Sequence, residues 1–153
     1  YGDPKLKTQE NPGEISQDAI DRLHQMMIEK MGDRAAFARW FGQYNSTRKY
    51  PDVDWREEQP IGIEKLREYL TDGMPLHRSP ASRFSFIRQE ANSVLLFVDG
   101  EEFSCTDENI TLAEIVCGHD NIIIDENLLR SDSAMALIAK LYGQGSVYFD
   151  QED

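Results

Sequence analysis

The dipeptide Asp99-Gly100 is the feature that most constrains how this chain can fold. It follows the apolar run Val94–Val98, and Phe103 and Cys105 alternate with polar residues after it. Two strand-like runs joined by Asp-Gly are the strongest local signal for a β-hairpin, because both residues of its tight turn need positive φ angles. The sequence therefore predicts a hairpin centred on this turn.

Helical patterns flank the hairpin on both sides. Before it, an apolar stripe of helical spacing runs from Ile63 to Leu70 and ends at Gly73, a glycine in the position of a C-terminal cap. After it, we expect a helix over 111–118, a brief strand over 121–124, helices over 125–130 and 131–142, and an edge strand with Val147 and Phe149. This order predicts an α+β fold, with a winged-helix-like domain over residues 61–153.

Two short amphipathic helices, forming a helical hairpin over residues 15–47, are predicted ahead of that domain. Ser16 and Asp33 are good N-caps for them. Their apolar faces carry methionine and aromatic side chains, which suit cores and interfaces equally. The pattern alone leaves two alternatives open, packing on the rest of the domain or contact with a second copy of the chain. The residues of the candidate dimer interface are Leu23, Met27, Met31, Phe37, Trp40, Phe41 and Tyr44.

The segments 1–14 and 48–60 lack helical or strand periodicity and are expected to be linkers. The first opens Tyr1-Gly2-Asp3-Pro4, polar and turn-like. The chain has no apolar run near the ~20 residues of a membrane-spanning helix, and we expect no secretory leader. Its two cysteines, Cys105 and Cys117, are expected to be buried thiols. We therefore expect a cytoplasmic location.

The charge of the chain argues against nucleic acid as a direct partner. Sixteen basic and twenty-eight acidic residues give a net charge of −12, whereas binding to phosphates needs a concentrated basic surface. The helix over 111–118 would be the DNA-reading element of a winged helix, yet it offers Glu114 and no basic residue. The turn Asp99-Gly100-Glu101-Glu102 is acidic as well, so we expect the domain to make protein contacts.

No complete catalytic, cofactor or metal site is found in the sequence. None of the three histidines, His24, His77 and His119, stands in a His-x-Asp/Glu pattern, and the two cysteines lack C-x-x-C spacing. Motifs for a serine nucleophile or a phosphate loop are absent as well. The sequence therefore predicts an interaction module.

Three stretches resemble the bacterial cupin-type JmjC ribosomal oxygenases, which hydroxylate arginine in a large-subunit ribosomal protein. They are the run Leu23–Met27, the run from Phe37 to Arg48 that contains Phe37-Ala38-Arg39-Trp40-Phe41-Gly42, and the final Gly145–Phe149. The opening Tyr1–Pro4 is similar to the point where the family's catalytic barrel ends. The similarity spans nearly the whole chain and carries over none of the barrel's metal ligands.

The resemblance implies a homodimerising helical region over 15–47, followed by the winged-helix-like domain. Fe(II) and 2-oxoglutarate would belong to an upstream barrel absent from this chain, and a ribosomal protein would be the substrate of the parent enzyme. The chain would then be a dimerisation and substrate-positioning region. The alternative is a freestanding winged-helix adaptor without catalysis.

Overall fold

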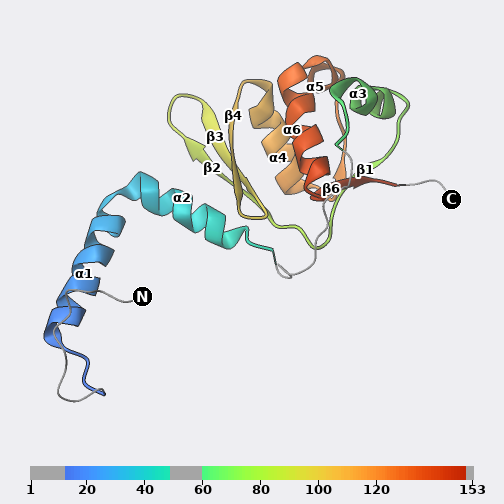
Figure 1. The fold of residues 1–153 in the computed structure, drawn as a ribbon. Helices are drawn as coiled ribbons and strands as arrows, with labels where there is room; N and C mark the ends of the chain where they lie inside the picture. Colours follow the sequence, from blue (N-terminus) through green and yellow to red (C-terminus); the bar gives the residue numbers. More distant parts are fainter. Residues whose placement is uncertain (1–12, 49–59, 151–153) are drawn as a thin grey trace. The chain divides into compact units, whose positions relative to one another are not determined.

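The computed structural model describes residues 13–48 and 60–150 (Figure 1). The chain separates into two compact units, Tyr1–Trp40 and Phe41–Asp153. The first holds helix α1 (Gln17–Gly32) and the beginning of α2 (Arg34–Asn45). The predicted linkers over 1–14 and 48–60 lie almost wholly outside the described residues.

The second unit is an α+β domain, as expected, with four helices beyond α2 and two small antiparallel sheets among its described residues. One sheet has the strand order β5-β1-β6 and the other has the order β2-β3-β4. The elements in chain order are α3 (Ile63–Thr71), β1 (Leu76–Arg78), β2 (Phe84–Gln89), β3 (Ser93–Val98), β4 (Glu101–Thr106), α4 (Glu108–Gly118), β5 (Asn121–Ile122), α5 (Glu126–Arg130), α6 (Asp132–Gly143) and β6 (Val147–Phe149).

The structure confirms the predicted hairpin. Strands β3 and β4 pair from Val98↔Glu101 outward, and the turn between them has positive φ angles at Asp99 (53°) and Gly100 (83°). Positive φ at both central residues is the geometry that Asp-Gly favours. The predicted caps are also present. Ser16 accepts a hydrogen bond from Ala19 N, and Gly73, with φ of 78°, follows α3.

Two elements differ from the sequence expectation. Helix α4 begins at Glu108, three residues before the predicted start at 111. Strand β1 was not predicted, although it is the central strand of its sheet and pairs with both β5 and β6. A strand of three residues directly after Pro75 is too short to show a period of two. It can be recognised only from its pairing with β5 and β6.

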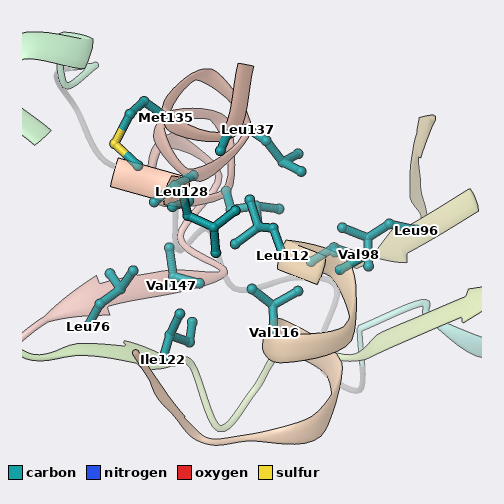
Figure 2. Close-up of a cluster of buried hydrophobic side chains, with 14 of the residues drawn as sticks. Leu76, Leu96, Val98, Leu112, Val116, Ile122, Leu128, Met135, Leu137 and Val147 are labelled. Atoms are coloured by element: carbon teal, nitrogen blue, oxygen red, sulfur yellow. The ribbon is translucent and has the colours of Figure 1, made fainter. Parts of the chain in front are cut away.

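The core of the domain lies between the helices and the strands of both sheets (Figure 2). Leu76 of β1 is 1% exposed and lies with Ile122 and Val147 from the neighbouring strands, while Leu112 and Met135 come from α4 and α6. Burial of apolar side chains at this scale is the main stabilising contribution to such a domain.

Strand β3 is buried on both of its faces. Val94, Leu96 and Val98 belong to the core cluster, whereas Phe97 points to the opposite face and is still 0% exposed. A Cβ atom added at Gly42 of α2 would lie 2.4 Å from the ring of Phe97. The helix therefore lies against the strand at a position where only glycine fits, and it covers the second face there.

We expect Gly42→Ala to destabilise the domain by about 1–3 kcal/mol, because the ring of Phe97 is fully enclosed and must move to admit a methyl group. Gly143→Ala is the matched control. Its added Cβ has no neighbour within 4 Å, so the change should be neutral or slightly stabilising. Urea unfolding followed by tryptophan fluorescence and far-UV circular dichroism measures both. Equal stability of the two variants would contradict the close packing.

Candidate interaction site

Helix α1 carries the first half of the candidate site. It begins after the N-cap Ser16, and none of its residues is buried. Leu23 is 59% exposed, Met27 49% and Met31 60%. Met26 and Ile28 are also exposed, so at 100° per residue the apolar arc covers about 200° of the helix. An arc this wide is typical of a helix that contacts more than one neighbour.

Helix α2 carries the second half and has two distinct sides. Asp33 caps its start, with its Oδ1 accepting a hydrogen bond from Ala36 N at 3.1 Å. The aromatic side chains of one side are exposed by 40–68%, and the rings of two of them lie 5.8 Å apart. By helical geometry, Gly42 lies on nearly the opposite side, where it contacts Phe97. The aromatic residues are Phe37, Trp40, Phe41 and Tyr44.

The exposed apolar surface is concentrated in this part of the chain. Among the described residues, thirteen large hydrophobic side chains are exposed, and eleven of them lie between Ile15 and Tyr44. All seven residues of the predicted dimer interface are among the eleven. Sequence periodicity found the central stripe but missed Ile28, which lies at its margin. We call these eleven exposed side chains together the apolar helix surface; nine belong to the first unit, and Phe41 and Tyr44 belong to the second.

The groups with catalytic potential are scattered. His24 lies on α1, His77 Nε2 lies 2.9 Å from Asp150 Oδ2, and His119 follows the last turn of α4. No group of three or more His, Cys, Asp or Glu side chains that could hold a metal occurs within 13–48 and 60–150. Likewise, no helix in these ranges is long and apolar enough to cross a membrane.

The two cysteines are free thiols in the structure. Cys105 is buried in β4 and Cys117 is partly buried in α4. Burial raises the pKa of the Cys117 thiol to about 12, and it raises the pKa of Cys105 as well. A nucleophilic cysteine needs a lowered pKa, so these thiols have the properties of core side chains.

Two arginines of the second unit, Arg78 and Arg88, form ion pairs within the domain. Arg78 donates to the carbonyl oxygens of Val116 and Cys117 at the end of α4 and pairs with Asp120 at 2.6 Å. Arg88 pairs with Glu114 of α4 at 3.0 Å. The one acidic residue expected to face outward from that helix is therefore balanced by a neighbour in the fold.

A buried carboxylate, Asp99, is the polar centre that the sequence did not reveal. Its Oδ2 accepts hydrogen bonds from Ser82 Oγ (2.7 Å) and Ser146 Oγ (2.6 Å), and it lies 2.9 Å from Arg48 Nε. Its Oδ1 accepts from the backbone N of Arg83 at 2.9 Å. The expectation that Asp99 adds to an acidic surface at the turn is wrong, because its side chain is only 6% exposed.

This cluster joins segments that are distant in the sequence. Arg48 also donates to the carbonyl oxygen of Gln144 at 2.8 Å, and Ser46 Oγ accepts from the backbone N of Gly100 at 3.1 Å. Charge-assisted hydrogen bonds of this kind are roughly twice as strong as neutral ones. The residues that follow α2 are thus held to the β3–β4 turn and to the turn after α6.

Removing the Asp99 carboxylate should lower the stability of the domain. We expect Asp99→Ala to destabilise the domain by about 3 kcal/mol, because it leaves Arg48 and two serine hydroxyls without their buried acceptor. Asp120→Ala, which removes a carboxylate that is 92% exposed, should cost less than about 1 kcal/mol. Chemical denaturation of both variants measures the difference. Similar losses of unfolding free energy in the two variants would show that the Asp99 cluster contributes little to stability.

Comparison with known families gives a match over most of the chain. The model of the ROXA-like winged helix family matches residues 25–148. The ribosomal protein uL16 3-hydroxylase of Escherichia coli strain K12 is 22% identical over 153 residues, which cover 98% of this chain and 39% of that protein. The chain therefore spans about two fifths of the length of this curated relative.

Part of the Escherichia coli protein YcfD, in its solved structures, has the same fold as this chain. One X-ray structure aligns with a TM-score of 0.65 at 20% identity, over 98% of this chain and 39% of that one. A complex of the YcfD ribosomal oxygenase with cobalt and 2-oxoglutarate aligns with a TM-score of 0.65 at 21% identity, over 99% and 40% of the two chains. This similarity supports the winged-helix assignment of the fold.

Proposed function

This chain belongs to the ROXA-like winged helix family, and we propose that it is the dimerisation and substrate-positioning C-terminal region of a ribosomal protein arginine hydroxylase. The parent enzyme would use Fe(II) and 2-oxoglutarate. The relative that is 22% identical is a ribosomal protein hydroxylase, and a solved relative of the same fold holds 2-oxoglutarate. The observation that carries the proposal for this chain is the apolar helix surface.

The size of this surface supports contact with another protein surface. Monomeric soluble proteins rarely expose large contiguous apolar patches, and such patches mark interfaces. Leu23, Met31, Trp40 and Tyr44 are each more than half exposed. Burying one such side chain is worth roughly 1.5–3 kcal/mol, so a partner that covers several of them gains considerable free energy.

A second copy of the chain is the partner that we propose. The alternative is packing of the aromatic side chains on the rest of the same domain. The side of α2 which meets β3 is the side of Gly42, and the aromatic side chains Phe41 and Tyr44 are 52% and 68% exposed. Most soluble oligomers are symmetric homodimers whose two subunits use the same patch.

The catalytic chemistry belongs, in this proposal, to the part of the parent that the 153 residues do not include. The described residues contain no set of ligands that fits an iron ion. The residues of this chain would instead hold two catalytic regions together. The net charge of −12 would favour the approach of a basic ribosomal protein, because complementary fields raise association rates.

Trp40→Glu combined with Phe41→Glu tests the dimer. We expect this variant to be a folded monomer, with a dimer dissociation constant raised at least about 100-fold, because it places two charges in an apolar contact. Ile123→Glu, at an exposed apolar residue outside the helices, is the control and should remain dimeric. Multi-angle light scattering gives the mass, and circular dichroism checks folding. A double variant that stays folded and dimeric would refute this interface.

The enzymatic half of the proposal is tested on the complete parent protein, expressed from the whole gene. With Fe(II), 2-oxoglutarate and ribosomal protein uL16, we expect the mass of uL16 to rise by one oxygen atom on an arginine, as detected by tandem mass spectrometry. The same dimer variant should lower kcat/KM. A gene that encodes no catalytic region upstream of Tyr1 would contradict the proposal and favour the freestanding adaptor.

A further inference from the structure

The winged-helix domain has a groove far in sequence from the apolar helix surface. It lies where the end of α3 meets the segment 121–124, and its volume is about 310 Å³. Six apolar residues line it together with Gly73 and Asn121, namely Leu70, Met74, Pro75, Ile122, Ile123 and Ile124. Pockets for small ligands begin near about 300 Å³, so this groove is at the lower end of that range and has room for a large apolar side chain.

Ile123 distinguishes this groove from the rest of the domain surface. It is 74% exposed, although its neighbour Ile122 is 4% exposed and lies in the core. Among the described residues that follow Tyr44, only Ile123 and Tyr148 are large exposed hydrophobic side chains. An isoleucine left in water at the rim of an apolar groove gains free energy when a partner covers it.

The backbone beside the groove offers a second kind of contact. Strand β5 (Asn121–Ile122) stands at the edge of its sheet and has one strand neighbour, β1. Edge strands present backbone N–H and C=O groups that an extended peptide can pair with, and alternate side chains of such a peptide then enter pockets on the sheet. The groove and the edge thus suit an extended segment.

The charged residues that neighbour the groove's lining in the sequence are acidic, which indicates the chemistry of that segment. Within two sequence positions of the lining residues there are five carboxylates and no Lys or Arg. Three of them form ion pairs, with Arg78, Arg130 and Lys65, but their carboxylates are 58–92% exposed. Such exposed ion pairs are weak, so these carboxylates can pair with a partner's Lys or Arg instead. The five carboxylates are Glu68, Asp72, Asp120, Asp125 and Glu126.

From this placement we infer that the groove between α3 and β5 is a docking site for an extended basic segment of another protein, which inserts one apolar side chain between Met74 and Ile124. The segment adds its backbone to the edge of β5, covers Ile123 and places Lys or Arg near these five carboxylates. This site is independent of the apolar helix surface and of the dimer proposed above.

The probe is a synthetic peptide, acetyl-Lys-Thr-Lys-Leu-Lys-Thr-Lys-amide, titrated into the ¹⁵N-labelled full chain. We expect amide shifts at Asp72, Asn121 and Ile123, and an affinity that falls as ionic strength rises. A peptide with serine in place of leucine should bind at least about fivefold more weakly, because it has no side chain to insert. Equal affinity of the two peptides would overturn the proposal.

Matched variants test whether the peptide binds at the groove beside β5. Ile123→Ser should weaken binding of the leucine peptide about fivefold, and Asp72→Asn about twofold at low salt. Ile15→Ser is the control, since Ile15 is 75% exposed and Ile123 74%, and it should leave the affinity unchanged. Shifts confined to α1 and α2, or an equal effect of both serine variants, would refute docking at β5. Neither result depends on whether the chain dimerises.

Discussion

The second unit of this chain is organised around one buried negative charge. Asp99 occupies a left-handed turn, and its carboxylate accepts hydrogen bonds from serine hydroxyls and a backbone amide while facing Arg48. Leaving such a charge without donors inside a protein is costly, so each donor must be in place for the turn to form. The segment after α2, the loop before β2 and the turn after α6 are therefore specified together.

Local chemistry was enough to predict much of this fold. The Asp-Gly turn, the caps at Ser16 and Asp33, and the glycine after α3 follow from backbone preferences of single residues, and the structure has all of them. The apolar face of the first two helices was visible because a stripe of three- and four-residue spacing needs no tertiary information.

The parts that were missed depend on contacts between distant residues. Strand β1 has three residues, and its position at the centre of a sheet is defined by partners that are about 45 and 70 positions away. The role of Asp99 was misjudged for the same reason. An aspartate in a turn is usually solvated, and its partners Arg48 and Ser146 are too distant in the sequence to be recognised. The turn at Ala91 and Asn92, both with positive φ, also lacks the glycine that would have marked it.

The glycine against Phe97 has a consequence for how this domain can be cut and how it folds. Residues 42 and 97 are separated by more than fifty positions in the sequence. The face of β3 that carries Phe97 is nevertheless exposed to water until α2 packs on it. A fragment that starts at residue 61, where the winged-helix pattern begins, would leave a phenyl ring on a sheet face in water and would tend to aggregate. The smallest autonomous unit therefore begins before Gly42, and late docking of this helix would be a slow, non-local step in its folding.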